Sequence, residues 1–325
     1  LPDEAAQHAD TLILGPGEEA FPRFIKDLRE GHPQKRYVAS WRSIENIPPV
    51  RRDLIKREKY FVPNSLVVSR GCPHHCDFCY KDAFYSEGKS FYTRKVDDAL
   101  AEIDSLPSRH LYFLDDHLLG NPHFASELFE GMRGMGRVFQ SASTVAAVLN
   151  GNLIEKAAEA GLRSLFLGFE TFSPDNLRSS NKLQNLSKDY VAAVKRLHSL
   201  GIMINGSFVF GLDHDDKDVF RRTVDWGIEH SITTATFHIL TPYPGTRLFQ
   251  QMERDGRITS YDWSQYDTRT VVYKTLGLTA EELKQGYEWA YHNFYSWSNI
   301  FKASFGHDNI KQQLAHLLYM GGWKK

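Results

Sequence analysis

Short apolar runs alternate with amphipathic segments through the middle of the chain. Six runs have the length and composition of buried β-strands: 65–69, 110–114, 137–142, 163–169, 203–211 and 234–240. Apolar residues at helical spacing fill the stretches that follow them: 93–106, 123–133, 151–160, 187–200, 216–230 and 245–255. Strand and helix therefore alternate six times, a pattern typical of parallel strands joined by crossover helices.

The alternation predicts an α/β fold built on one parallel sheet. Continuous apolar strands indicate that both faces of the sheet are covered. Right-handed crossovers curl such a chain into an open sheet or a barrel. Polar residues gather directly after the strands, where barrel enzymes carry their active sites. We therefore favour a partial (β/α)6 TIM-like barrel over a doubly wound sheet.

Some helix boundaries carry signals of their own. Thr93 and Ser187 have the residue type of N-caps at the starts of two helical segments. Thr279, followed three residues later by Glu282, has the pattern of a capping box. This box predicts a long helix, rich in aromatic residues, near the C-terminus.

The two ends of the chain differ from its middle. An apolar run and an amphipathic segment near the N-terminus predict one strand (11–14) and one helix (19–29). These two elements cannot bury a core alone, and the chain has no initiator Met. We interpret them as the remnant of an N-terminal Rossmann-like α/β domain that starts upstream. The predicted organisation is this remnant (1–30), a Pro- and Arg-rich linker (31–63), the barrel (64–256) and a C-terminal helical extension (257–325).

Composition narrows the classes of partner. Apolar residues make up 42% of the chain and charged residues 24%, which is ordinary for a globular protein. With 39 basic and 40 acidic residues the formal net charge is −1, so charge gives no reason to expect nucleic acid or an anionic membrane as partner. No run of about 18 apolar residues occurs, so we expect no membrane span.

All three cysteines of the chain fall within eight consecutive positions, as Cys72, Cys76 and Cys79, after the first predicted strand. An odd number cannot pair completely within the chain, and no signal peptide is visible, so we expect a reducing cytoplasm. Three thiolates on a [4Fe–4S] cluster leave the fourth iron free for an exogenous ligand, and thiolates are the usual ligands of such clusters. The spacing therefore favours a metal centre with one open position.

Other interpretations of the cysteines stay open from the spacing alone. Together with His74 or His75 they could complete a Cys3His zinc site, which would be four-coordinate and closed. They could also be buried thiols without a ligand, or three ligands of an electron-transfer cluster that takes a fourth from elsewhere.

The stretch CPHHCDFCY resembles the Cys-x3-Cys-x2-Cys signature of the radical S-adenosylmethionine (SAM) superfamily. In that superfamily the three cysteines ligate a [4Fe–4S] cluster and SAM binds the open iron. One electron cleaves SAM to methionine and a 5′-deoxyadenosyl radical, which abstracts a hydrogen atom from the substrate. The resemblance extends over roughly residues 60–275 and implies that Cys72, Cys76 and Cys79 are the cluster ligands. It gives Phe78 the place of an aromatic residue that packs near the adenine of SAM.

Further stretches resemble the SAM-binding motifs of the superfamily. Asp115 and Asp116 follow the second strand, where a glycine-glycine-glutamate sequence more commonly holds the SAM amino group. Glu170 matches an acid that accepts hydrogen bonds from the SAM ribose. Gly206 and Gly211 match a glycine-rich strand that contacts adenine. The resemblance thus implies that these five residues line the SAM site.

The number of cysteines selects among branches of the superfamily. Branches with auxiliary clusters need more thiols than this chain contains. The turn TPYPGT after the sixth strand and the N-terminal remnant instead resemble the group with an N-terminal cobalamin-binding domain. That resemblance implies hydrogen abstraction, followed by methyl transfer from methylcobalamin or by other radical chemistry. A cobalamin-independent dehydrogenase or group transferase, and a non-catalytic zinc-binding α/β protein, remain alternatives.

The resemblance also implies partners. We expect SAM and a [4Fe–4S] cluster as cofactors, with cobalamin bound if an upstream domain is present. An electron donor of flavodoxin or ferredoxin type would reduce the cluster. The substrate is expected to be a small or lipid-like molecule, and its identity is not readable from the sequence.

Overall fold

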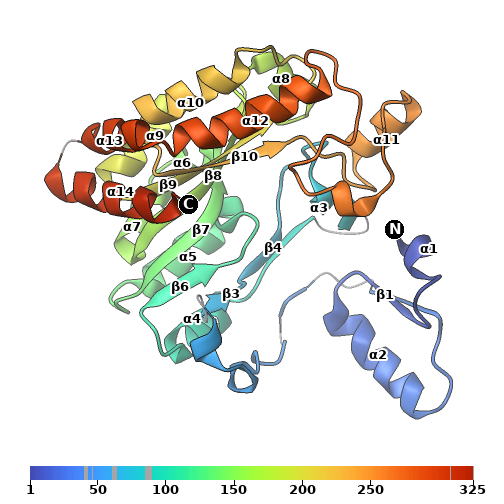
Figure 1. The fold of residues 1–325 in the computed structure, drawn as a ribbon. Coiled ribbons are helices and arrows are strands. Elements are labelled where there is room, and N and C mark those ends of the chain that lie inside the picture. Colours follow the sequence, from blue (N-terminus) through green and yellow to red (C-terminus); the bar gives the residue numbers. More distant parts are fainter. Residues whose placement is uncertain (40–42, 46, 61–63, 85–89, 308, 325) are drawn as a thin grey trace.

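The computed structural model describes residues 1–39, 43–45, 47–60, 64–84, 90–307 and 309–324. Its centre is a six-stranded parallel sheet in the order β10-β9-β8-β7-β6-β3 (Figure 1). The strands are β3 (Ser65–Leu66), β6 (His110–Phe113), β7 (Val138–Thr144), β8 (Leu162–Glu170), β9 (Met203–Phe210) and β10 (Thr234–Ile239). Each strand overlaps one of the six apolar runs, so the predicted strand order is confirmed.

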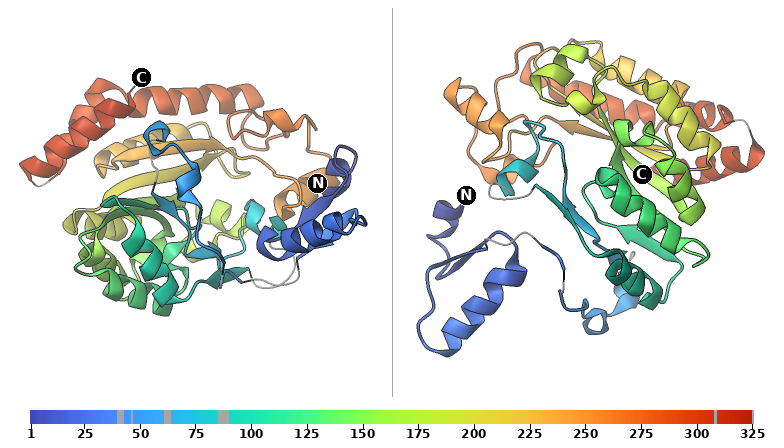
Figure 2. Two further views of the ribbon diagram at one scale, coloured as in Figure 1. Left: turned by 90° about the horizontal axis from the view of Figure 1, so that it is seen from below. Right: turned by 180° about the vertical axis from the view of Figure 1, so that it is seen from behind.

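Helices cover the outer face of the sheet, as the end-on and rear views show (Figure 2). The helices that follow the strands are α4 (Val96–Ser105), α5 (Pro122–Met132), α7 (Leu153–Ala160), α9 (Tyr190–Ser199), α10 (Val219–Glu229) and α11 (Arg247–Arg254). The sheet starts with β3 and ends with β10, and no described strand pair joins these two ends. The architecture is therefore the predicted partial (β/α)6 barrel, open along one side.

Two predicted N-caps are wrong. Helix α4 begins after Lys95, because Thr93 lies in the short strand β5 (Phe91–Thr93). Helix α9 begins after Asp189, whose side chain accepts a hydrogen bond from the backbone of the first turn. Ser187 stands two residues earlier with a positive φ of 57°, which lies outside the extended region that an N-cap usually adopts.

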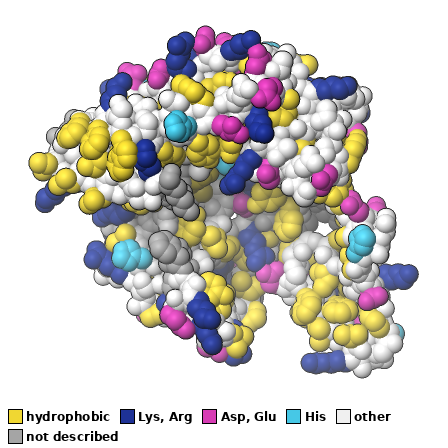
Figure 3. All heavy atoms as spheres, in the orientation of Figure 1, with side chains coloured by type: hydrophobic (Ala, Val, Ile, Leu, Met, Phe, Trp, Pro, Cys, Tyr) yellow, Lys and Arg dark blue, Asp and Glu magenta, His cyan; other side chains and the backbone are white. Residues whose placement is uncertain are grey.

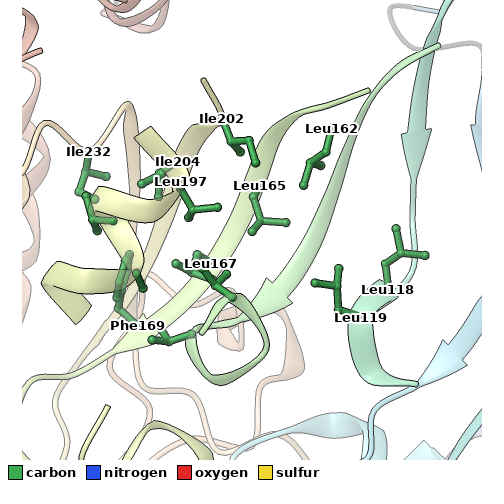
Figure 4. Packing of buried hydrophobic residues seen from close by; sticks show 14 of the residues in the cluster. Leu118, Leu119, Leu162, Leu165, Leu167, Phe169, Leu197, Ile202, Ile204 and Ile232 are labelled. Atoms are coloured by element: carbon green, nitrogen blue, oxygen red, sulfur yellow. The ribbon is translucent and has the colours of Figure 1, made fainter. Parts of the chain in front are cut away.

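The core of the barrel lies between the sheet and its helices (Figure 4). On β8, Leu165, Leu167 and Phe169 point into this core, where they are fully buried. Side chains alternate across a strand, so Phe166 and its neighbours at even positions face the barrel interior. The side chain of Phe166 is 37% exposed there. The interior is therefore accessible, although the apolar run predicted that both faces would be covered.

Helix α12 (Ala280–Phe294) closes the outer edge of β10 and begins at the predicted capping box, which is present. The hydroxyl of Tyr291 accepts a hydrogen bond from Phe237 N and donates one to Phe237 O, each 3.1 Å long. Tyr295 pairs in the same way with Ala235, at 3.1 and 2.9 Å. Because an uncovered edge strand presents unpaired backbone groups, the two tyrosines take the place of a seventh strand.

The N-terminal segment forms a small unit of its own. After helix α1 (Pro2–Ala5), strand β1 (Leu12–Leu14) and helix α2 (Gly17–Arg29) lead into strand β2 (Arg36–Val38), which pairs with β1 in parallel. Strand β2 falls within 31–63, which we predicted to be linker. Only its middle residue is buried, so three residues were too few to show periodicity. The division of the chain into domains stays a prediction.

Two further helices end the chain. Helices α13 (Trp297–Phe305) and α14 (Ile310–Trp323) pack on each other and, through α13, on α10. None of the described helices is long and apolar enough to cross a membrane.

A buried histidine in this region predicts a pH effect on stability. Nδ1 of His316, on α14, lies 2.9 Å from the Ser304 hydroxyl, and burial lowers the pKa of His316 to about 4. The unfolded chain has the ordinary value of about 6.5, so it binds the proton more tightly, and stability is lost as pH falls from about 6.5 to about 4. Between these pH values, the free energy of unfolding of the variant His316→Gln is expected to fall by about 2–3 kcal/mol less than that of the parent chain. Urea unfolding measures this difference.

The control is His123→Gln on α5, whose side chain is 85% exposed. It should keep the pH profile of the parent chain. If His316→Gln kept it as well, the buried neutral state of His316 would be disproved.

Candidate functional site

The three cysteines occupy a loop at the end of the barrel where the parallel strands have their carboxyl ends. The loop joins strand β4 (Ser69–Gly71) to the short helix α3 (Tyr80–Phe84). Cys72 and Cys76 are buried, Cys79 is half-buried, and none of the three forms a disulfide. The predicted single strand at 65–69 is in fact split, since β4 leaves the main sheet and pairs with β5 in antiparallel orientation. This split aims the loop across the mouth of the barrel.

Two carboxylates hold the chain on both sides of this loop. Asp115 accepts hydrogen bonds from the backbone N–H of Ser69 and from its hydroxyl, the latter at 2.5 Å. Burial raises the pKa of Asp115 to about 6, although these hydrogen bonds act to lower it. Asp116 accepts from Gly71 N at 3.0 Å and from the Tyr80 hydroxyl at 3.2 Å. Asp115 is therefore a buried support of the loop, whereas Asp116 is only half-buried.

Glu170 ends strand β8 in an unusual conformation. Its φ is 64°, and the register of β8 against β9 shifts between Gly168 and Glu170. Strained backbone of this kind persists only where the surroundings enforce it, and it is common at functional sites. The surroundings here include Asn185, whose side chain donates to the carbonyls of Gly168 and Phe169 at 2.9 and 3.2 Å. The bulge turns the Glu170 carboxylate toward the cysteine loop.

A buried lysine, which our sequence analysis missed, forms an ion pair with Glu170. Lys182 Nζ lies 2.7 Å from Glu170 Oε1, and the two side chains are 8% and 12% exposed. A Cβ atom at position 168 would meet Glu170 Oε1 at 2.5 Å and Lys182 Nζ at 3.2 Å, so Gly168 provides the space for the pair. Although burial acts to lower the pKa of Lys182, Glu170 and Cys76 raise it above its usual range.

The segment around Lys182 also supports the cysteine loop. We define the support segment as residues 180–186, between α8 (Pro174–Ser179) and α9. Gln184 Nε2 lies 3.3 Å from the Cys76 sulfur, and Asn181 Nδ2 donates to His75 O at 2.6 Å. Ser180 O accepts from the backbone of the loop at 3.0 Å. The sequence signal that could have revealed the support segment is the polar run SSNKLQN, soon after the strand that ends at Glu170. The structure shows this run to be partly buried.

Cationic side chains counter the burial of the thiols. Burial raises the pKa of Cys76 and Cys79, whereas Lys182 lowers that of Cys76 and Lys81 lowers that of Cys79. Metal ligation requires the thiolate form. Hydrogen bonds to cysteine sulfur and local charge also set the reduction potential of an iron–sulfur cluster. Lys81, Lys182 and Gln184 are thus suited to stabilise an anionic centre on this loop.

The other predicted SAM-site residues lie in three different settings. Phe78 packs on apolar side chains at the ends of β9 and β10, with Lys182 Nζ 5.9 Å from its ring centre. Gly206 faces the helices, since its Cβ would meet the Phe208 ring at 3.0 Å. Gly211 has a φ of +92° and donates to the Asp215 carboxylate at 2.9 Å, which makes it a turn after β9. Phe78 therefore lies beside the Glu170–Lys182 pair and the cysteines, and the SAM contact of Gly206 stays a prediction.

The donor set suits a cluster better than a single ion. Among the described His, Cys, Asp and Glu side chains, the only three whose ligand atoms gather within 4.8 Å are Asp27, Glu30 and His32. At least two of the three cysteine sulfurs therefore lie more than 4.8 Å apart, wider than the separation of about 3.8 Å that Zn–S bonds of about 2.3 Å require in a tetrahedron. Three cysteine thiols on one loop are the usual kind of ligand set for a [4Fe–4S] cluster.

Comparison with known proteins agrees with this chemistry. The family model described as the radical SAM superfamily matches residues 66–227. The chain is 30% identical over 319 residues to bacteriochlorophyllide d C-12(1)-methyltransferase of Chlorobaculum tepidum. The match covers 94% of this chain and 69% of that protein. It is 27% identical over 335 residues to the anaerobic magnesium-protoporphyrin IX monomethyl ester cyclase of Cereibacter sphaeroides, covering 92% of this chain and 53% of the cyclase.

A solved structure shares the fold. The radical SAM methyltransferase TsrM from Kitasatospora setae, with cobalamin and a [4Fe–4S] cluster bound, superposes with a TM-score of 0.61 at 14% sequence identity. The match covers 87% of this chain but only 65% of TsrM, so the chain spans less than two thirds of that protein. The cysteine loop, the partial barrel and the similarity along nearly the whole chain lead to one conclusion: the chain belongs to the radical SAM superfamily.

Proposed function

We propose that this chain is the catalytic part of a radical SAM enzyme that generates a 5′-deoxyadenosyl radical and abstracts hydrogen from a small or lipid-like substrate. The observation that carries the proposal is the loop of three unpaired cysteines, which the Glu170–Lys182 pair adjoins at the mouth of the barrel. When bound there, a [4Fe–4S] cluster supplies the electron that cleaves SAM. Cys72, Cys76 and Cys79 would hold it.

The remaining residues would bind and orient SAM. Glu170 uses Oε1 for Lys182, which leaves Oε2 to accept hydrogen bonds from the ribose hydroxyls. Phe78 offers a half-buried aromatic surface next to this carboxylate, suited to an adenine ring. The Asp116 carboxylate contacts the backbone at the start of the loop, where it would accept from the SAM amino group. Gly211 shapes the turn after β9 and would contribute backbone alone.

The names of the relatives favour methyl transfer with cobalamin over the alternatives. Bacteriochlorophyllide d C-12(1)-methyltransferase is similar along nearly all of this chain, and the structure of TsrM contains cobalamin. The unit formed by β1, α2 and β2 would be part of the domain that binds it. Cyclisation is the second candidate, because one relative is a cyclase.

The proposed reaction needs a reductant and a reducing compartment. A donor of flavodoxin or ferredoxin type would deliver the electron, since a low-potential cluster needs a low-potential reductant. Unpaired cysteines and an oxygen-sensitive cluster suit a reducing cytoplasm.

The direct test is anaerobic reconstitution of the chain with iron and sulfide, followed by SAM and dithionite. We expect about four irons and four sulfides for each chain, a brown colour, and 5′-deoxyadenosine as a product detected by mass spectrometry. Omission of dithionite is the control, which should give no 5′-deoxyadenosine. One equivalent of zinc without sulfide would instead establish the zinc-binding alternative.

A further inference from the structure

The two C-terminal helices expose a continuous apolar surface. Trp297, Phe301 and Phe305 recur every four residues on α13, and Ile310, Leu314 and Leu318 do so on α14. We call these six side chains the hairpin face. Each is between 44% and 76% exposed. Figure 3 shows yellow side chains gathered over these two helices at the left of the molecule. Scattered exposed apolar residues are normal, but a contiguous patch marks an interaction site.

The hairpin face is not needed to hold the helices in place. Ile300 and Ala303 on α13, and Met320 on α14, point inward and are fully buried in the main core. On the outside, the ring centres of Trp297 and Phe301 are 6.1 Å apart, and those of Phe301 and Phe305 are 6.5 Å apart. The hairpin face therefore lies on helices that are anchored by other residues.

Lysines accompany the hairpin face on both helices. From residue 289 to the end, the sequence contains four lysines and a single acidic residue. Lys302 and Lys311 are exposed on α13 and α14, and Lys324 Nζ lies 5.2 Å from the Trp297 ring centre. The balanced charge of the whole chain gave no reason to expect an anionic membrane as partner, because it conceals this local excess.

We propose that the hairpin face binds the surface of an anionic lipid bilayer, with α13 and α14 lying along the headgroup layer. Helices with Trp, Phe and Leu on one side and lysines beside them are typical of such interfacial binding. A second copy of the chain would place lysines against lysines, which is unfavourable, whereas anionic headgroups neutralise them.

A cavity lies close to the hairpin face. A cavity of about 810 Å³ opens between β10 and α12, and Lys324 belongs to its lining, together with Arg269, Tyr291 and Tyr295. Docking would place this cavity next to the lipid, so that a lipid-soluble substrate could reach the barrel without crossing water. This second step rests on the proposed function, but the docking does not.

Vesicle flotation of the 325-residue chain tests the docking, without SAM or reductant. We expect binding to vesicles of phosphatidylcholine and phosphatidylglycerol, and weaker binding to phosphatidylcholine alone or in high salt. The triple variant Ile310→Ser, Leu314→Ser, Leu318→Ser should lower the partition coefficient at least about tenfold. The double variant Lys302→Glu, Lys311→Glu should abolish the preference for anionic vesicles.

The matched control is Leu54→Ser with Leu276→Ser, two leucines that are 72% and 66% exposed elsewhere. It should bind vesicles as the parent does, and thermal unfolding should show that all variants fold. Absence of vesicle binding by the parent would overturn the proposal. A dimer in light scattering that the hairpin variants dissociate, without vesicle binding, would overturn it in favour of self-association. Formation of 5′-deoxyadenosine in solution tests the proposed function separately.

Discussion

Replacing Cys76 by alanine is expected to abolish cluster assembly and to lower 5′-deoxyadenosine formation more than a hundredfold, to the background of the assay. Two thiolates cannot hold a cluster that three must hold, and no other cysteine exists in the chain. The variant should also lose its visible absorption and most of its iron after anaerobic reconstitution. Both readouts are direct, so the cluster and the reaction are measured separately.

A residue that contacts the loop offers a matched control for Cys76→Ala. Ser90 holds the backbone N–H of Cys72 through its own carbonyl, at 3.1 Å, and an alanine keeps that carbonyl. Ser90→Ala should therefore assemble the cluster and produce 5′-deoxyadenosine like the parent. Parent levels of product from Cys76→Ala would remove the cluster assignment.

The second large effect is expected at the ion pair beneath the loop. Lys182→Met leaves the buried Glu170 carboxylate without its cation, and breaking a buried pair in this way typically costs about 3–5 kcal/mol of stability.

Glu170→Gln should instead weaken SAM binding by about 1–3 kcal/mol, or roughly fivefold to 150-fold, because the ribose hydroxyls lose a charged acceptor. Urea unfolding measures the first quantity, and equilibrium dialysis with SAM on the reconstituted protein measures the second.

The double variant separates the two roles of the pair. With both Lys182→Met and Glu170→Gln, no unpaired charge is buried, so most of the lost stability should return. Binding of SAM should stay weak, because the carboxylate is still missing. If all three variants bound SAM as tightly as the parent, Glu170 would have no part in ribose recognition. If Lys182→Met unfolded at the parent's urea concentration, the pair would not be a buried one.

Local patterns in the sequence were sufficient for the fold and for the grouping of the three cysteines on one loop. Six apolar runs separated by amphipathic segments predict six crossovers, and the handedness of crossovers leaves few arrangements. Cys72, Cys76 and Cys79 lie within eight residues, so their spacing alone brings them to one loop. The capping box before α12 is equally local, and the structure confirms it.

Contacts between distant segments could not be predicted in the same way. In the sequence, Lys182 cannot be told from a surface lysine. It becomes a buried partner of Glu170 because of the bulge at Glu170 and because Gly168 has no side chain to fill the space of the pair. Gly206 illustrates the opposite case, because one position along a strand decides which face a residue occupies. A Cβ atom at Gly206 would therefore face the helices, so that only its backbone is open toward the barrel interior.

The sequence by itself determined the order of strands and helices, the grouping of three thiols on one loop and the class of chemistry, because each depends on neighbours along the chain. Only the tertiary structure decided which charges surround that centre, how tyrosines of α12 close the edge of β10, and that the apolar sides of α13 and α14 remain uncovered. These depend on the packing of segments that are far apart in sequence, where burial and hydrogen-bond geometry select the partner.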